Sequence, residues 1–382
     1  MGAVVQITNC HIHTFTHRHS PDRFVRPPLN WLLRIGWLRR GLLRLVSRFD
    51  RGRRGRLARF AEILEISDRA TQQEVFEVVR GFYPSGTRFV VLPMDMEFMG
   101  AGRVAESIDV QHAQLAALRD RYPDSVIPFA AVDPRHEAVV EKTIRLLEDQ
   151  RFRGIKLYPP TGYHPNDPAL RPLYAYAEEH DVPVLTHCSR PASVQYRGQP
   201  TERMRTDPVT GERLDLDRLQ LLTLFTDPDS YRPILSSHPS LRICLAHFGG
   251  AGDWAAYLNR PWDADDTEPA EKSWLAKIAD MIRSGDYPNL WTDIAYTAFA
   301  DDEHIYLLKV LLSDERILAR TLFGSDFYVV ANARLEERRR ALRTRAVLGE
   351  ELFWIIAEDN PKRFLGEPRH AQAQAEIAHA EH

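Results

Sequence analysis

Apolar segments of strand length alternate with helical patterns along most of this 382-residue chain. Most of the segments between these strand-like segments repeat apolar residues at three- and four-residue steps, which is typical of amphipathic helices. A strand–helix alternation is typical of a parallel sheet, and eight such units suffice for a closed barrel. We therefore predict an α/β fold, a (β/α)8 TIM barrel, with strands near residues 4–9, 88–93, 126–132, 153–158, 182–187, 241–247, 290–294 and 320–326.

A doubly wound open sheet is the alternative, and it calls for a glycine-rich turn after the first strand. The turn here is His11-Ile12-His13, which favours the barrel. We predict one barrel domain over residues 1–366 and a flexible tail over 367–382. The barrel carries a basic helical insertion at 17–65, after strand one, and a long loop at 189–217, after strand five.

The composition is that of a soluble globular protein, with 44% hydrophobic and 27% charged residues. Three cysteines cannot form a disulfide framework, and no apolar run is long enough to span a bilayer. With no signal-peptide pattern at the N-terminus, we expect a cytoplasmic protein.

Side chains that bind metals stand where several predicted strands end. His11 and His13 are two residues apart, so a strand would point them to the same face. Two imidazoles aimed at one point form half of a transition-metal site, although His17 and His19 make a histidine-bearing loop the simpler alternative. The catalytic face of a barrel lies at the strand C-termini, where this chain places Lys156, His187, His247, Asp293 and Asp326.

The cysteines lie at odd offsets from these histidines: Cys10 beside His11, Cys188 beside His187, and Cys244 three residues before His247. In a regular strand this places them on the opposite face, towards the helices. We expect Cys10 and Cys244 to be buried rather than to bind metal. We expect the side chains of His17, His19 and His112 to face solvent.

With these residues in place, the chain resembles the amidohydrolase superfamily over about residues 4 to 366. The strand-one His-x-His pattern matches His11 and His13, and the family's later histidines match His187 and His247. Its strand-eight aspartate matches Asp326. Three segments are most similar to the amidohydrolase-2 branch, namely His-Phe-Gly-Gly from residue 247, Gly-Ser-Asp-Phe from 324 and Asn-Pro-Lys-Arg-Phe from 360.

The resemblance implies one divalent metal ion, zinc first and manganese second, bound by His11, His13, His187 and Asp326. It places His247 beside the metal as a general acid or base. Asp326 is an alternative proton acceptor, compatible with weak metal binding. Such a metal lowers the pKa of a bound water towards ~7, which supplies hydroxide at neutral pH.

Lys156 is open to three interpretations. Its segment, Gly-Ile-Lys-Leu-Tyr-Pro, resembles that of superfamily members in which a carboxylated lysine bridges two metals. A bare ammonium would instead bind a substrate carboxylate, and a lysine at the barrel rim is the plain structural alternative. We expect Arg190 and Tyr158 to contact substrate as well, and Asp293 to orient a metal ligand from behind.

The predicted function is metal-dependent hydrolysis of a small ester, lactone or amide. Non-oxidative decarboxylation of a small carboxylated or aromatic compound is the alternative on the same metal. Phosphoester hydrolysis, as in TatD-like relatives, usually needs a carboxylate at strand four, where this chain has Lys156. The partner is then a small molecule and not a nucleic acid, and self-association as a homo-oligomer stays open.

The basic segment at residues 26–60 is the remaining feature. Apolar residues recur at helical spacing from Trp31, and arginines fill the positions between them. This pattern permits a peripheral membrane anchor, a function of a different class. Packing on the barrel, as a roof over the metal site, is the interpretation that we prefer.

Overall fold

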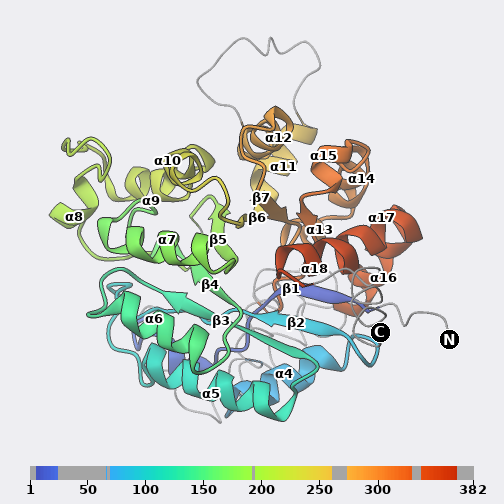
Figure 1. Ribbon diagram of the computed structural model, residues 1–382, viewed down its shortest axis with the longest axis horizontal. Coiled ribbons are helices and arrows are strands. Elements are labelled where there is room, and N and C mark those ends of the chain that lie inside the picture. The colour runs from blue at the N-terminus through green and yellow to red at the C-terminus, as the bar shows by residue number, and fades with distance from the viewer. Residues whose placement is uncertain are drawn as a thin grey trace, which may run out of the picture.

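A computed structural model describes residues 6–24, 66, 69–191, 194–259, 273–328 and 337–367 of the chain. Eight parallel strands follow one another around a single sheet in sequence order (Figure 1). The fold is therefore the predicted TIM barrel. The strands are β1 Thr8–Ile12, β2 Arg88–Val91, β3 Val126–Val132, β4 Gly154–Leu157, β5 Val184–Ser189, β6 Ile243–Gly249, β7 Leu290–Asp293 and β8 Thr321–Leu322.

The first and last strands of the barrel, β1 and β8, are joined by a few backbone hydrogen bonds rather than by a regular ladder. The Cys10 amide donates to the Phe323 carbonyl at 2.8 Å, and the Asp326 amide donates to the His11 carbonyl at 2.8 Å. Ile12 and Phe327 form an isolated parallel bridge. These contacts nearly close the barrel and place the residues that follow β8 against the end of β1.

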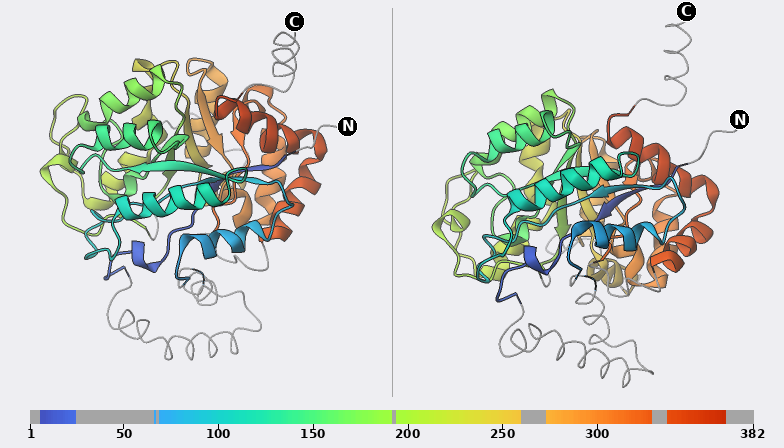
Figure 2. Two further views of the ribbon diagram at one scale, coloured as in Figure 1. Left: turned by 60° about the horizontal axis from the view of Figure 1, so that its bottom comes forward. Right: turned by 90° about the horizontal axis from the view of Figure 1, so that it is seen from below.

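Helices cover the outside of the barrel (Figures 1 and 2). Side-chain caps fix where several of them begin: Thr71, Ser107 and Ser273 each accept a backbone N–H of the first turn. The helices are α4 Gln72–Arg80, α5 Ile108–Arg121, α6 Val139–Glu148, α7 Arg171–Glu179, α8 Glu202–Arg205, α9 Arg218–Thr226, α10 Arg232–Ser237, α11 Ala251–Leu258, α12 Trp274–Ser284, α13 Thr297–Ala300, α14 Asp302–Leu311, α15 Glu315–Leu318, α16 Glu337–Leu348, α17 Glu350–Trp354 and α18 Asn360–Phe364.

The interior of the barrel is a packed core that is separate from the layer between strands and helices. It takes one or two side chains from most strands, among them Cys10, Val90, Leu92, Phe129, Leu185, Cys244, Trp291 and Leu322. The prediction that Cys10 and Cys244 face the helices is therefore wrong, although both are buried. The register of β1 shifts between Asn9 and Ile12, which defeats simple counting along the strand. Cys188 packs on the helix side as predicted, with its thiol 3.3 Å from the Thr226 carbonyl.

The loop after β5 crosses the same end of the barrel as the loops after β2 and β4. The Tyr196 amide donates to the Pro160 carbonyl, and the Arg197 amide donates to the Met99 carbonyl. The Tyr196 ring packs on Gly162. This loop therefore packs against the loops that follow β2 and β4.

Most of the basic insertion, including the whole of residues 26–60, lies outside the described residues, as does nearly all of the tail after 367. None of the helices in the described ranges is long and apolar enough to cross a membrane.

Candidate metal centre

The two histidines of β1 converge at the C-terminal end of the barrel. His11 lies within β1, and His13 follows its last residue. Both rings use Nδ1 for a hydrogen bond, His11 with the Asp293 carboxylate at 2.8 Å and His13 with the Leu92 carbonyl at 2.7 Å. A carbonyl only accepts, so the His13 Nδ1 carries the proton. This tautomer leaves the lone pair of Nε2 available to bind a metal.

Asp326 faces both of these nitrogens. Its Oδ1 lies 3.1 Å from His13 Nε2 and 3.6 Å from His11 Nε2. Burial opposes ionisation, but the contact with His13 and the charges of the nearby imidazoles outweigh it and lower the pKa of the carboxyl. A hydrogen bond from His13 Nε2 to this carboxylate requires the doubly protonated ring, whereas metal binding requires the neutral one. His11, His13 and Asp326 therefore bring two imidazoles and a carboxylate together, with one ligand atom of each within 4.8 Å of the others.

The backbone of Asp326 is left-handed, with φ at 62°. Such a conformation costs a residue with a side chain roughly 1–2 kcal/mol. Hydrogen bonds to β1 hold it, because the Asp326 amide donates to the His11 carbonyl and the His13 amide donates to the Phe327 carbonyl at 2.6 Å. The carboxylate is thus aimed at the histidine pair by the chain around it.

Asp293, at the end of β7, forms a second group of potential metal ligands with His11 and His247. One carboxylate oxygen pairs with His11 Nδ1. The other accepts the backbone N–H of His247 at 2.8 Å and that of Ala295 at 3.1 Å. One buried aspartate therefore fixes the ring of His11 and the backbone of His247 together, as carboxylates behind metal-binding histidines do.

His187 and His247 form a second pair of rings next to the first. His187 Nδ1 lies 3.0 Å from His247 Nε2, and His187 Nε2 lies 2.9 Å from the Ser189 hydroxyl. The His247 and His11 rings are 4.9 Å apart. Burial, followed by the charge of His247, lowers the pKa of His187 well below its usual value. The structure therefore places His187 next to the cluster, with both of its nitrogens in hydrogen bonds and outside the group formed by His11, His13 and Asp326.

Lys156, on β4, has a buried ammonium group. The side chain is 1% exposed, and among the described residues its Nζ has no hydrogen-bond partner. Burial lowers its pKa from 10.5 to about 8. Beside it lies a small cavity of about 10 Å³, lined also by Asp95, Asp133 and Tyr158.

Tyr158 stands over the second histidine pair. Its ring lies 4.6 Å from that of His187, and its hydroxyl donates to the Val194 carbonyl at 3.2 Å. Lys156 Nζ is 5.9 Å from the centre of the same ring. Tyr158 thus links the loop after β5 to the strand ends, and its contact with substrate stays a prediction.

Arg190 is committed elsewhere in this structure. Its guanidinium pairs with Asp253, with Nε 2.9 Å from Oδ2, and stacks over the Trp274 ring. Asp253 also accepts the Trp274 amide at 2.8 Å, which fixes this arrangement. A contact between Arg190 and substrate therefore stays a prediction, and it would require the pair with Asp253 to open.

Two histidines expected at the surface are buried. His19 is 2% exposed and its Nε2 lies 3.2 Å from Glu106. His112 is 4% exposed and accepts the Ala131 backbone N–H. The prediction of solvent exposure is wrong for both, because each ring meets a specific polar partner inside the fold.

A third group of potential metal ligands, which the sequence reasoning did not single out, lies beyond β2 and β3. It consists of Asp95, Glu97 and His136, and the Asp95 carboxylate lies 2.6 Å from His136 Nε2. Asp95 and Asp133 both follow strand ends, which was the available signal. Arg135 pairs with Asp133, and the Glu97 carboxylate accepts the Ile108 amide. Most of these carboxylates therefore already have partners.

The donor set at β1 and β8 fits a divalent metal. His11 Nε2 is buried and lacks a hydrogen-bond partner among the described residues, which is costly for a polar atom unless something else binds it. Burial and the nearby Lys156 charge lower the pKa of His11 well below its usual value, so the ring is neutral and able to bind metal. Imidazole nitrogens with a carboxylate oxygen are the ligands that zinc and manganese accept.

Solved structures resemble this one over nearly its whole length. A 5-carboxyvanillate decarboxylase from Novosphingobium aromaticivorans, with manganese bound, has a TM-score of 0.55 and 16% identity, covering 94% of this chain and 97% of that one. A 2,6-dihydroxybenzoate decarboxylase from Rhizobium has a TM-score of 0.53 and 15% identity, covering 95% and 99%. A probable 2-pyrone-4,6-dicarboxylic acid hydrolase from Acinetobacter baumannii has a TM-score of 0.53 and 12% identity, covering 94% and 99%. At these identities the likeness shows the fold alone.

No protein of curated function matches the sequence. A family model described as amidohydrolase does match, over residues 10–366, from the residue before His11 to two residues beyond α18. The match spans β1 to β8 and every strand end described above, and on this ground the chain belongs to the amidohydrolase-2 family.

Proposed function

We propose that this protein is a metal-dependent hydrolase of a small ester, lactone or amide whose substrate also carries a carboxylate. The observation that carries the proposal is the buried ammonium of Lys156, which has no hydrogen-bond partner within the described ranges and lies beside a cluster of potential metal ligands. A buried ammonium without a hydrogen-bond partner is costly, and a substrate carboxylate would supply one.

In this proposal His11, His13 and Asp326 hold one divalent ion, and His187 is the fourth ligand once its Nε2 exchanges Ser189 for the metal. Bound there, the ion would supply a nucleophilic water at neutral pH and polarise the bond to be broken. Zinc is our first choice and manganese the second. A binuclear site with a carboxylated Lys156 is the alternative.

The second histidine pair handles the proton in this proposal. His247 Nδ1 faces the Ala295 carbonyl at 3.0 Å, so that nitrogen carries a proton. Its Nε2 faces His187 Nδ1, and a single proton between those two nitrogens satisfies both. If its hydrogen bond with His187 opens, His247 can take a proton at Nε2 and return it to a leaving group, the role of a general acid and base. Asp326 is the alternative proton acceptor.

Non-oxidative decarboxylation is the second candidate. Several similar structures are named as decarboxylases of hydroxylated benzoates. The cluster is also well shielded from water, since His11 is fully buried and Asp326 nearly so. However, a carboxylate paired with Lys156 would be stabilised as an anion, which slows its loss as carbon dioxide. For this reason we place hydrolysis first.

A product analysis tests the choice. The metal-loaded protein would be incubated with carboxylated lactones and esters and with hydroxylated benzoates, and the products followed by mass spectrometry. Hydrolysis adds the elements of water, whereas decarboxylation removes carbon dioxide. Turnover of the benzoates alone, with release of carbon dioxide, would replace the first candidate with the second.

We further propose that one domain spanning 1–366 carries this activity in the cytoplasm. Residues 26–60 and the loop at 189–217 would cover the site. Binding of a membrane surface through 26–60 is the alternative, from a different class of function. Deleting residues 26–60 separates the two. If the segment covers the site, the deletion should alter turnover; if it binds a membrane surface, the deletion should alter only the association with liposomes.

A further inference from the structure

A fully buried asparagine joins the two segments that carry the metal ligands. The Asn9 side-chain oxygen accepts the backbone N–H of His11 at 3.2 Å and that of Ser325 at 3.1 Å. Its side-chain nitrogen donates to the Ser325 hydroxyl at 2.9 Å and to the Tyr83 hydroxyl at 3.1 Å. All four hydrogen-bonding positions of the amide are thus used, two of them on the residue before Asp326.

The chain of hydrogen bonds continues to the outer layer of the barrel. The Tyr83 hydroxyl donates to the Glu337 carboxyl at 2.7 Å, and Ser325 also hydrogen-bonds to Glu337. Glu337 is the first residue of α16 and is 3% exposed. Glu337 therefore connects the start of α16 to the segments before β2 and after β8.

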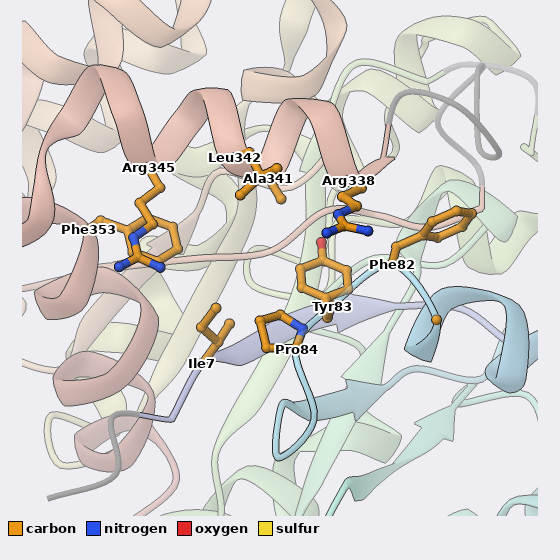
Figure 3. Close-up of a pocket in the computed structure, with 10 residues that line it drawn as sticks. Ile7, Phe82, Tyr83, Pro84, Arg338, Ala341, Leu342, Arg345 and Phe353 are labelled. Carbon is orange, nitrogen blue, oxygen red and sulfur yellow. The ribbon is translucent and has the colours of Figure 1, made fainter.

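Tyr83 forms part of a cavity at the opposite end of the barrel from the metal-binding cluster. The cavity has a volume of about 280 Å³ and lies between the start of β1, the turn before β2, and α16 (Figure 3). Figure 3 shows Tyr83 and Arg338 on neighbouring walls, with Leu342 along the same helix. This open space lets the Tyr83 side chain move if its hydroxyl loses its partners.

The segment after β8 depends on such contacts. Regular pairing in β8 covers only Thr321 and Leu322, and Asp326 follows in a left-handed conformation. Because no ladder extends to Asp326, its position against β1 is set by individual hydrogen bonds. The Asn9 amide supplies those at Ser325, next to the ligand, and those at His11.

We propose that Glu337 is a positioning residue for the metal site, acting through Tyr83, Asn9 and Ser325 to hold Asp326 in register with His11. The inference rests on the metal centre of the proposed function. Glu337 and Tyr83 touch none of the proposed ligands. Their effect is to fix the Asn9 amide in the orientation that binds both backbone segments.

The test is titration of metal-free, full-length protein with Zn²⁺ and with Mn²⁺. Loss of a group behind metal ligands typically weakens metal affinity about 10–100-fold, and for Tyr83→Phe we expect the lower end of that range. Glu337→Leu should weaken metal affinity by the same factor as Tyr83→Phe. Glu337→Gln keeps an oxygen that accepts the Tyr83 hydroxyl, so it should bind metal within about twofold of the wild type. The double variant Tyr83→Phe/Glu337→Leu should lose less metal affinity than the sum of the two single losses, because the two variants share the broken Tyr83–Glu337 hydrogen bond.

Tyr174→Phe is the matched control. Tyr174 is a buried tyrosine whose hydroxyl donates to the Pro165 carbonyl at 2.7 Å, with no link to β1 or β8. It should lose stability comparably but keep metal affinity. If Tyr83→Phe and Glu337→Leu, folded cooperatively, bind metal as tightly as this control, the positioning role is refuted.

Amide hydrogen exchange provides a readout that needs no metal. The Asp326 amide is hydrogen-bonded to the His11 carbonyl, so a loosened β8 segment should exchange it faster in Tyr83→Phe than in Tyr174→Phe. Faster exchange together with no metal binding by the wild type would support the positioning network and refute the metal centre. Unchanged exchange would count against the network itself.

Discussion

Lys156 is the single residue whose surroundings most narrow the substrate. Its ammonium is buried close to His11, His187, Asp293 and Asp326, whose charges it feels, and burial lowers its pKa to about 8. In the proposed function it binds a carboxylate only while protonated. Its charge therefore predicts both a mutational effect and a pH dependence.

We expect Lys156→Met to raise KM for a carboxylated substrate roughly 10–100-fold, the value of one hydrogen bond to a charged group. In the wild type, KM should be flat below the pKa of about 8 and rise above it, because deprotonation removes the attraction. Steady-state kinetics across this range would show both effects. Lys156→Met should also resist denaturant better, since it removes a buried charge. An unchanged KM in a folded variant would rule out this contact.

Glu337 predicts a pH dependence of folding stability. Burial raises its pKa from 4.5 to about 7. Between these values the folded protein binds a proton that the unfolded chain has released, so the free energy of unfolding falls as pH rises. Above pH 7 the loss is complete and amounts to roughly 3 kcal/mol at about 1.4 kcal/mol per pKa unit.

Glu337→Gln removes this titration. We expect the variant to exceed the wild type in free energy of unfolding above pH 7, and the advantage to shrink as pH falls towards 4.5. Urea unfolding at both ends of this range would measure it. A difference that does not change with pH would mean that Glu337 keeps its ordinary pKa.

At the scale of elements, the contact between β1 and the segment after β8 sets the geometry of the site. Gly324 lies at the point of closest approach. A Cβ built there would lie 2.9 Å from His11 Cβ and 3.2 Å from Ala295 Cβ. Only glycine lets the segment that carries Asp326 pass this close to the first ligand.

Gly324→Ala should therefore push the two segments apart. We expect a loss of roughly 1–3 kcal/mol in stability, and metal affinity weaker by about tenfold or more. Gly252→Ala on α11 is the control, because nothing lies within 4 Å of its new methyl group. Metal titration with denaturant unfolding would separate the two variants. Equal metal affinity in both variants would show that the close packing of Gly324 against His11 does not affect metal binding.

The elements themselves were largely predictable. All eight strands lie near their predicted positions, with two differences: β1 begins at Thr8 rather than near residue 4, and β8 covers only Thr321–Leu322 of the predicted 320–326. Which side chains face the barrel interior was less predictable. The register shift in β1 and the left-handed His247, with φ at 69°, interrupt the alternation on which the inference about Cys10 and Cys244 depended.

For the whole molecule, the metal centre predicts a link between metal content and stability. A ligand that binds only the folded state stabilises it by about 2.7 kcal/mol at 100 times its dissociation constant. We expect about one divalent ion per chain by elemental analysis, and a lower melting temperature after chelation.

His13→Ala should abolish this response to metal, whereas His180→Ala, an exposed histidine on the outer surface, should keep it. A stoichiometry of two ions, lost in Lys156→Met, would instead support the carboxylated lysine. A melting temperature indifferent to both chelator and added metal would refute the centre.

The sequence by itself determined the number and order of the strand–helix units and the residues at the strand ends. These follow from local patterns, since periodicity and chain order are carried by neighbouring residues. The tertiary structure decided which partners those residues meet. Asn9 bonds to Ser325 across 316 residues, Arg190 is held by Asp253, and His112 turns inward to the Ala131 amide. The Asn9–Ser325 hydrogen bond exists only once the barrel nearly closes, and the other two only once neighbouring strand–helix units pack together. No local pattern encodes such contacts, because the partners meet within about 3 Å only in the folded chain.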